Sequence, residues 1–515
     1  MKTDTTSTKH IQQSPCAFVL FGATGDLTRR KIVPALFSIY TQKLLPEGFV
    51  IVPFARRDKS DEEYRKDLYD AIKQFAPKLN VDGKEWEEFS SRIFYVKSEL
   101  NDLEGYHRLS KRLSELDEQY KLLGNRLFYL ATPPDNFSEI IQMLGESKLN
   151  KVEKEGSWHR IIIEKPFGVD LKSASALNKE LQGVFDENQI YRIDHYLGKE
   201  TVQNILVLRF ANTIFEPLFN KNYVDRVEIT VAETLGMEGR GNYFEHAGIT
   251  RDIVENHALQ VLTLIAMEPP MSLEADATRD EKVKVLNSIR PFSASDVAHY
   301  TVRGQYGPGT IQTADGTEKA VGYREEPGVD PCSDTETFAA FRFAIDNWRW
   351  QGVPFYVQAG KRMKERLTEV KVFFKPVPEV LFARRSYGQL QPNCLTLRIQ
   401  PDEGATLDVS SKIPGPEMQI QTVSMEFKYG SSFDVPIRDA YERLIVDAIR
   451  GDAALFARND EVEAAWSLIT PILEAWRDLS CPLFPNYEAG SMGPDAAIDL
   501  LRKGYVGHPG EAHRD

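Results

Sequence analysis

Nine consecutive residues, 191–199 (YRIDHYLGK), combine an acid, a histidine, two tyrosines and two cationic side chains. His195, Tyr196 and Lys199 can each donate a hydrogen bond to a phosphate dianion. Asp194 can orient a histidine elsewhere in the chain and stabilise its charged form. If residues 190–196 are extended, alternation sends the side chain of Asp194 to one side and that of His195 to the other. Each of these side chains taken alone is more often structural or solvated, but their clustering predicts an anion-binding pocket beside an acid–base pair.

A histidine suited to act as the base lies in the stretch 248–267, GITRDIVENHALQVLTLIAM. By i, i+3 and i, i+4 counting, one face of the expected helix holds Ile249, Ile253, His257, Gln260 and Leu264. A buried histidine is often structural, yet histidine is also the side chain best suited to take a hydroxyl proton near neutral pH. Asp252 lies about 140° around an α-helix from His257, so we expect it to face another group.

The N-terminal region carries the pattern of a dinucleotide-binding fold. An apolar run at 17–21 is followed by the glycine turn GATGDLTR, 22–29, and then by apolar residues at helical spacing. Gly22 permits a tight turn and Gly25 lets backbone N–H groups approach a pyrophosphate. The spacing GxxGxx differs from the usual GxGxxG, so this motif alone also fits a generic strand–helix turn.

The second strand of this region, 48–58, indicates which coenzyme binds. It ends in Arg56, at a place where an acid would suit the ribose of NAD and an arginine suits a 2′-phosphate. We therefore expect NADP. The alternative is that Arg56 is a solvated charge at the end of a strand.

Further strands are expected at 126–134 and 160–168, with helices such as 172–185 between them, which predicts a mostly parallel sheet. Lys165 follows a buried strand at the edge where such sheets bind ligands. Its charge needs a partner, either a bound anion, a hydroxyl-rich substrate or the neighbouring Glu164. The Lys165–Pro166 peptide bond could be cis.

The C-terminal half has a different pattern, in which strands follow one another with few helices between them. Such runs of strands predict an antiparallel sheet and an α+β domain. The expected strands are 223–234, 337–345, 354–359, 368–376, 394–400 and 418–428, and the flanking helices are 199–211, 248–267, 439–450 and 459–476. Residues 299–333 are polar and rich in glycine and proline, and we expect a loop. The predicted division is a disordered tail at 1–14, a Rossmann-like domain at 15–190 and a substrate-binding and dimerisation domain at 191–515.

Composition narrows the class of protein. The 515 residues carry a net charge of −13, which argues against non-specific binding to nucleic acid or anionic membranes. Four widely spaced cysteines fit a reducing compartment. No apolar run reaches the length of a membrane span, and the polar N-terminal residues lack the apolar segment of a signal peptide. We expect a cytoplasmic location.

Together these stretches resemble the glucose-6-phosphate dehydrogenase family. The resemblance runs in order from about residue 17 to residue 502 and is carried by FGATGDLTRRKIVPALF, NRLFYLATPP, RIIIEKPFG, RIDHYLGKE, GRGNYFEHAGITRDIVENH, VPFYVQAGK and DAYERLIVDAIRGD. It implies oxidation of glucose 6-phosphate at C1 to 6-phosphoglucono-δ-lactone, the first step of the oxidative pentose phosphate pathway. NADP⁺ would accept the hydride, no metal would take part, and the chain would form a homodimer through the large sheet or a homotetramer.

The resemblance also implies residue roles. His257 corresponds to the general base and Asp194 to its carboxylate partner, and Lys165 to a residue that touches both substrate and coenzyme. Phosphate binding is implied for His195, Tyr196 and Lys199, and further substrate contacts for Glu233, Asp252, Lys361 and Arg366. The implied coenzyme contacts are Gly22, Ala23, Thr24, Gly25, Asp26, Leu27, Thr28, Arg29, Arg56 and Tyr129.

Two other functions fit parts of this pattern. An NADP-dependent oxidoreductase of an unphosphorylated sugar would share the dinucleotide domain, the EKP lysine and the β-rich domain. The cluster at 195–199 argues against it. A non-catalytic sensor of NADPH or sugar phosphates would keep the pocket without turnover, and the pair Asp194 and His257 argues against that.

Overall fold

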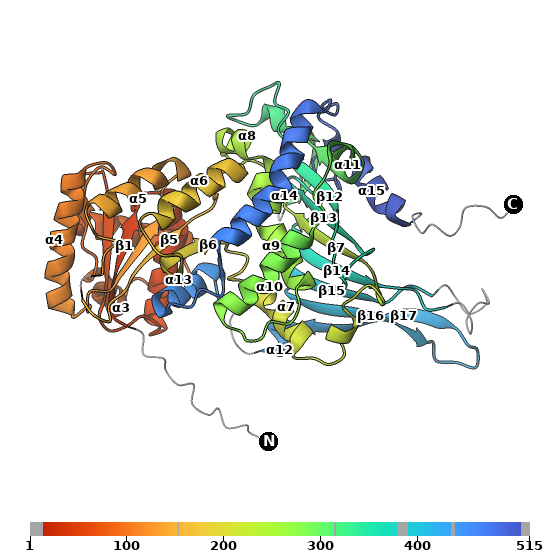
Figure 1. Ribbon diagram of the computed structural model, residues 1–515, viewed down its shortest axis with the longest axis horizontal. Coiled ribbons are helices and arrows are strands. Elements are labelled where there is room, and N and C mark those ends of the chain that lie inside the picture. Colours follow the sequence, from red (N-terminus) through yellow and green to blue (C-terminus); the bar gives the residue numbers. More distant parts are fainter. Residues whose placement is uncertain (1–13, 153, 314–315, 379–389, 434–437, 506–515) are drawn as a thin grey trace, which may run out of the picture. The chain divides into compact units, whose positions relative to one another are not determined.

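The computed structural model describes residues 14–152, 154–313, 316–378, 390–433 and 438–505 (Figure 1). The predicted disordered tail lies, apart from Ser14, outside these residues. The chain forms two compact units. Unit 1 comprises Met1–Gly168, Lys172–Gly198 and Arg438–Asn459, and unit 2 comprises Val169–Leu171, Lys199–Ile437 and Asp460–Asp515.

A seven-stranded sheet forms the centre of unit 1, in the order β18-β6-β5-β4-β1-β2-β3. Neighbouring strands pair in parallel, except that β18 pairs antiparallel with β6. Its inner strands are continuous apolar runs because helices cover both faces of the sheet. The strands are β1 (Cys16–Phe21), β2 (Phe49–Ala55), β3 (Val96–Lys97), β4 (Arg126–Leu130), β5 (His159–Ile163), β6 (Ile190–Ile193) and β18 (Phe456–Ala457).

Helices bury both faces of this sheet. Helices α1, α2, α3 and α13 share one apolar core with Phe18, Leu20 and Ile51 of the strands. On the other face, Tyr106 of α4 packs its ring against Phe21 and Phe54. The helices are η1 (Thr28–Ile32), α1 (Val33–Thr41), α2 (Asp61–Phe75), α3 (Lys84–Ser90), α4 (Leu103–Tyr120), η2 (Pro134–Asn136), α5 (Phe137–Glu146), α6 (Leu171–Gln182), η3 (Glu187–Gln189) and α13 (Ala440–Arg450). The predicted parallel sheet is confirmed.

The division into units differs from the predicted boundary at residue 190. Strand β6 pairs with β5, so the chain stays in unit 1 until Gly198. The segment Arg438–Asn459 then returns to unit 1 and adds α13 and β18. This return could not be read locally, because a helix predicted at 439–450 does not reveal which sheet it covers.

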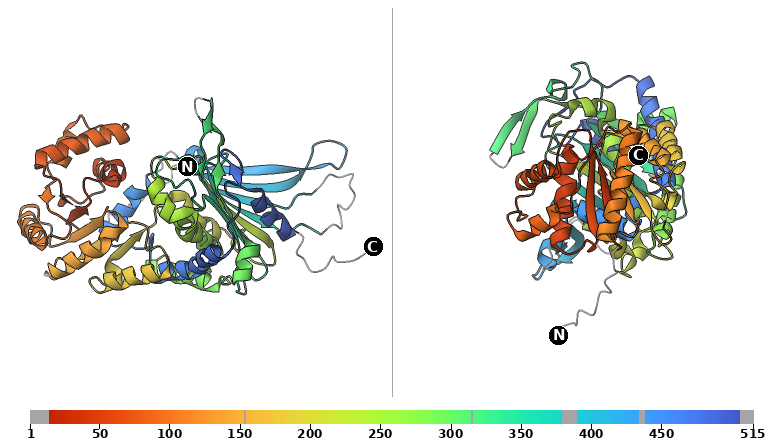
Figure 2. Two further views of the ribbon diagram at one scale, coloured as in Figure 1. Left: turned by 90° about the horizontal axis from the view of Figure 1, so that it is seen from above. Right: turned by 90° about the vertical axis from the view of Figure 1, so that its left-hand side faces the viewer.

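Unit 2 is built on an eight-stranded sheet in the order β17-β16-β15-β14-β7-β13-β12-β8 (Figures 1 and 2). All pairs are antiparallel except β7 with β13, which confirms the mainly antiparallel prediction. The strands are β7 (Val224–Ala232), β8 (Thr301–Gly304), β12 (Phe338–Ala344), β13 (Pro354–Gly360), β14 (Leu367–Phe374), β15 (Cys394–Gln400), β16 (Gly404–Lys412) and β17 (Ile420–Lys428).

Helices and short strands complete unit 2. The helices are α7 (Glu200–Phe210), η4 (Glu216–Leu218), α8 (Gly241–Ile249), η5 (Thr250–Ala258), α9 (Leu259–Ala266), α10 (Ala275–Ser288), α11 (Ala294–Tyr300), η6 (Tyr323–Glu325), α12 (Tyr429–Ser432), α14 (Asn459–Asp478) and α15 (Asp495–Tyr505). Two-stranded sheets join β10 (Gly309–Thr313) to β11 (Gly316–Ala320), and β9 (Tyr306–Gly307) to β19 (Tyr487–Glu488). None of the helices described is long and apolar enough to cross a membrane.

The expected loop at 299–333 is wrong in part, since it contains strands β8 to β11. These strands are two to five residues long and carry several glycines, so their local pattern is weak. Strand β16 was also not predicted. Its mixture of polar and apolar residues lies at the less buried end of the sheet.

Candidate active site

The glycine turn after β1 has the geometry of a coenzyme cradle. Gly22 has φ +76°, and a Cβ there would lie 2.4 Å from the carbonyl oxygen of Ala131. Only glycine fits so close an approach of two backbones. The hydroxyl of Thr28 donates to the carbonyl of Gly22 at 3.1 Å and holds the turn against the helix that follows. The predicted role of Gly22 in the turn is confirmed.

Two groups near the carboxyl ends of the strands suit a dinucleotide. Within the described residues, the buried hydroxyl oxygen of Thr132, just beyond β4, has no hydrogen-bond partner. Arg56 is exposed directly after β2, and no ion pair ties its guanidinium among the residues described. The hydroxyl of Thr132, the glycine turn at Gly22 and the guanidinium of Arg56 are together suited to binding NADP.

At the end of β5, Glu164 and Lys165 stand side by side with different surroundings. Glu164 is buried, and the hydroxyl of Tyr129 donates to its Oε1 at 2.5 Å. Burial raises the pKa of Glu164 to about 7. Lys165 is half-buried, and the Lys165–Pro166 peptide bond is cis, as the sequence had suggested. Because Tyr129 is fully buried, its hydroxyl acts on Glu164, and the direct coenzyme contact stays a prediction.

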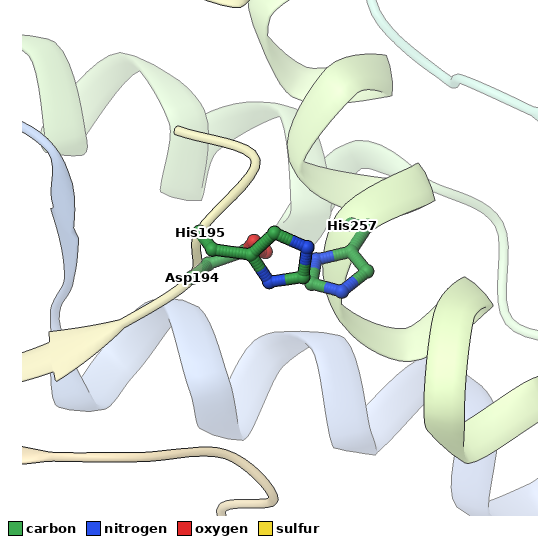
Figure 3. Close-up of side chains that lie close together, drawn as sticks. All are labelled: Asp194, His195 and His257. Carbon is green, nitrogen blue, oxygen red and sulfur yellow. The ribbon is translucent and has the colours of Figure 1, made fainter. Parts of the chain in front are cut away.

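The segment after β6 corrects one prediction. The strand ends at Ile193 and the chain turns at once, so alternation does not separate Asp194 from His195. The backbone N–H of Tyr196 donates to Asp194 Oδ1 at 2.9 Å, and that of Leu197 donates to the Asp194 carbonyl. These bonds fix a buried carboxylate at the strand end. Figure 3 shows Asp194 and His195 on this segment.

His257, also drawn in Figure 3, lies on a π-helix and not on the predicted regular α-helix. The break occurs at Gly248, whose φ is +62°, and the wide turns of η5 run from Thr250 to Ala258 before α9 begins. The α-helical angle between Asp252 and His257 therefore does not apply. Such π-helical turns often occur at functional sites. His257 is fully buried.

Asp252 faces a lysine, although the α-helical angle on which the expectation of a separate partner rested does not apply. Lys361, only 4% exposed, pairs with Asp252 at 3.4 Å and more closely with Glu233. Glu233 is held at the end of β7 because its N–H donates to the carbonyl of Gly360 at 2.9 Å. One ammonium and two carboxylates offer donors and acceptors for the hydroxyls of a sugar.

Lys199 and Arg366 converge on one neutral oxygen. The Nζ of Lys199 donates to Gln400 Oε1 at 2.5 Å, and Nη2 of Arg366 approaches the same atom at 3.4 Å. The amide nitrogen of Gln400 donates to the hydroxyl of Thr368 at 3.1 Å, which fixes its orientation. Two cations around one neutral acceptor favour the binding of an anion.

Sequence reasoning did not identify Gln400 as the residue between the two cations, nor Tyr441, whose hydroxyl hydrogen-bonds the carboxyl group of Glu164. Gln400 contacts Lys199 across 201 residues of sequence. The one feature of the sequence that could have indicated a role for Gln400 was its position at the end of a strand, because side chains there often line binding sites. Tyr441 lies in the segment that returns to unit 1, within the stretch DAYERLIVDAIRGD, but its type and spacing gave it no role.

A parallel sheet with a glycine cradle, joined to a unit bearing carboxylates and paired cations, defines a dinucleotide-dependent oxidoreductase of a hydroxylated, anionic substrate. Residues 19–204 match the glucose-6-phosphate dehydrogenase NAD binding domain, and residues 206–507 match the glucose-6-phosphate dehydrogenase C-terminal domain. The chain belongs to the glucose-6-phosphate dehydrogenase family, as its motifs predicted.

Individual relatives agree over nearly the whole length. The glucose-6-phosphate 1-dehydrogenase of Chlamydia pneumoniae is 48% identical over 493 residues, which cover 95% of each chain. That of Aggregatibacter actinomycetemcomitans is 46% identical over 488 residues, 95% of this chain and 96% of its own. A solved glucose-6-phosphate dehydrogenase in complex with its substrate glucose-6-phosphate is 36% identical, with a TM-score of 0.86 over 98% of this chain and 99% of that chain.

Proposed function

We propose that this chain oxidises D-glucose 6-phosphate at C1 to 6-phospho-D-glucono-1,5-lactone and transfers the hydride to NADP⁺. The observation that carries this proposal is the convergence of Lys199 and Arg366 on Gln400, in a chain of this family. An oxidoreductase of an unphosphorylated sugar has no phosphate in its substrate for these two cations to bind. Together with His195 and Tyr196, these cations bind the 6-phosphate.

In the proposed mechanism, His257 takes the proton of the C1 hydroxyl as hydride leaves C1. Asp194 stabilises the imidazolium that forms, because a buried carboxylate favours the charged histidine. Glu233, Asp252 and Lys361 hold the sugar hydroxyls, and so fix the C1–H bond in a reactive position. When bound, NADP⁺ would accept the hydride.

Residues of unit 1 would hold the coenzyme. The backbone from Gly22 to Arg29 would receive the pyrophosphate at the start of a helix. Arg56 would receive the 2′-phosphate, and Lys165 would contact both coenzyme and sugar. A cytoplasmic location stays a prediction.

Absorbance of the reduced nicotinamide tests this function directly. Purified protein is mixed with glucose 6-phosphate or glucose, and with NADP⁺ or NAD⁺. We expect rapid reduction with the phosphorylated sugar and chiefly with NADP⁺. Equal rates with glucose would favour the oxidoreductase of unphosphorylated sugars, and binding of NADPH without reduction in any mixture would favour the sensor.

Replacing Arg56 tests the basis of coenzyme preference. Arg56→Ala removes a charged contact worth about 1.5–3 kcal/mol, so KM for NADP⁺ should rise roughly 10–150-fold. KM for NAD⁺, which lacks the 2′-phosphate, should change little. The neighbouring exposed Arg57→Ala serves as the control, and we expect a much smaller effect. Equal losses with both coenzymes would remove Arg56 from the 2′-phosphate site.

We further propose that the chain forms a homodimer through the edge of the large sheet. The hairpin of β16 and β17, light blue in Figure 2, pairs Leu407 with Met425 and Val409 with Val423 on one face. Val423 is 43% exposed and Met425 55% exposed. Adjacent exposed apolar side chains on an edge strand suit burial against a second copy of the chain.

A charge placed on this apolar face should dissociate the dimer. Met425→Glu would bury an unpaired carboxylate at the interface, and should weaken association by roughly 100-fold or more. Thr422→Glu, which places the same charge on the other face of β17, is the matched control. Light scattering coupled to size-exclusion chromatography measures the mass. A Met425→Glu protein that remains dimeric would place the interface elsewhere.

A further inference from the structure

The buried carboxyl group of Glu164 has no part in the mechanism above, although it adjoins Lys165. Its side chain is 7% exposed. Tyr129 of β4 donates one hydroxyl to it, and Tyr441 at the start of α13 directs a second hydroxyl at the same carboxyl group. A carboxyl group buried this deeply costs stability that an apolar side chain would not, so its presence needs a reason beyond packing.

Two charged neighbours act on Glu164 in opposite directions. Burial is the dominant influence and raises the pKa of Glu164 to about 7, far above the usual range of a glutamate. The hydroxyls of Tyr129 and Tyr441 and the ammonium of Lys165 favour the ionised carboxylate, whereas the negative charge of Asp194 opposes it. The protonation state of Glu164 is therefore sensitive to any charge that arrives beside Lys165.

The N-terminal end of α13 ties these groups together. Asp439 caps the helix, with Oδ1 accepting from the N–H of Tyr441 at 2.9 Å, and this fixes the tyrosine. Gly198 ends the segment that carries Asp194, and a Cβ there would lie 2.8 Å from the carbonyl oxygen of Ala440. Glu164 and the turn bearing Asp194 are thus both packed against the start of one helix.

We propose that Glu164 is a positioning residue that takes up a proton when an anion binds beside Lys165. In the neutral state, Glu164 no longer offsets the positive charge of Lys165 and no longer repels Asp194. An arriving anion stabilises this state, so a proton passes from the buffer to the carboxylate of Glu164. Only the choice of NADPH as the anion rests on the proposed function.

Calorimetric titration with NADPH at pH 7.5, in two buffers of different protonation enthalpy, counts the protons taken up. We expect the wild type to take up about half a proton more than Glu164→Gln. Asp447→Asn is the matched control. Asp447 lies on α13 and is also a buried carboxyl group, and burial raises its pKa to about 6. Its proton uptake should equal that of the wild type. Protons lost by the 2′-phosphate of NADPH are common to all three proteins and cancel.

Equal proton uptake in the wild type and Glu164→Gln would overturn the proposal. Should Glu164→Gln fail to fold, Tyr441→Phe provides a second test. It removes a hydroxyl that favours the ionised form, so the pH of maximal uptake should rise, and an unchanged pH would contradict the proposal. Failure to oxidise glucose 6-phosphate would overturn the proposed function alone, because the titration requires no turnover.

Discussion

Replacing His257 by asparagine should lower kcat for glucose 6-phosphate oxidation by about 10²–10⁴-fold, the usual contribution of a general base. At 1.36 kcal/mol per tenfold change, the loss corresponds to roughly 2.7–5.4 kcal/mol of transition-state stabilisation. KM for the sugar and the affinity for NADPH should change little, because the amide keeps the approximate shape and polarity of the ring. Steady-state kinetics and a fluorescence titration with NADPH measure these quantities.

His246 provides the matched control for this substitution. It lies on α8, the helix that precedes η5, and it is exposed. His246→Asn should therefore retain wild-type kcat. If His257→Asn keeps kcat within about threefold of the wild type while His246→Asn does the same, another group must take the proton.

The start of the π-helical segment that carries His257 is held by a residue far away in sequence. Glu336 accepts the N–H of Thr250 at 3.2 Å through its carboxylate and that of Ile249 at 3.0 Å through its backbone carbonyl. A Cβ at Gly248 would lie 2.5 Å from the same carboxylate. The start of η5 is thus set by a residue on another segment, and the wide turns place Asp252 against Lys361.

Strands and glycine turns were predictable because their signals are local. The buried strands β1, β4 and β5 are short apolar runs that end in glycine, proline or charge, and each lies within a few residues of its predicted place. The need for glycine at position 22 was predictable because the motif requires a tight turn directly after the first strand. The position of Arg56 directly after β2 was predictable because the apolar run of this strand ends at that arginine.

The parts that could not be predicted depend on long-range contacts. Periodicity assigned an α-helix to the segment of His257, because the pattern does not reveal the break at Gly248 or the contacts of Glu336 with the start of η5. The expected alternation of the side chains of Asp194 and His195 failed because strand β6 ends at Ile193, before both residues. The convergence of Lys199 and Arg366 on Gln400 joins three segments that share no local pattern.

Removing the charge of Lys199 should chiefly weaken binding of the phosphorylated sugar. A hydrogen bond to a charged group contributes about 1.5–3 kcal/mol, so Lys199→Ala should raise KM for glucose 6-phosphate roughly 10–150-fold. kcat at saturating sugar should change little, because the phosphate is remote from C1. With glucose, which carries no phosphate, kcat/KM should stay near the wild-type value.

Lys319→Ala is the control for the loss of one positive charge, because Lys319 is exposed on β11. It should leave both sugars unaffected. A Lys199→Ala protein whose kcat/KM falls equally for both sugars would show that Lys199 maintains the site through Gln400 and not by binding phosphate. Arg366→Ala, alone and combined with Lys199→Ala, tests whether the two cations act together. Since both cations meet at Gln400 Oε1, their effects on KM should be less than additive if they bind one phosphate together.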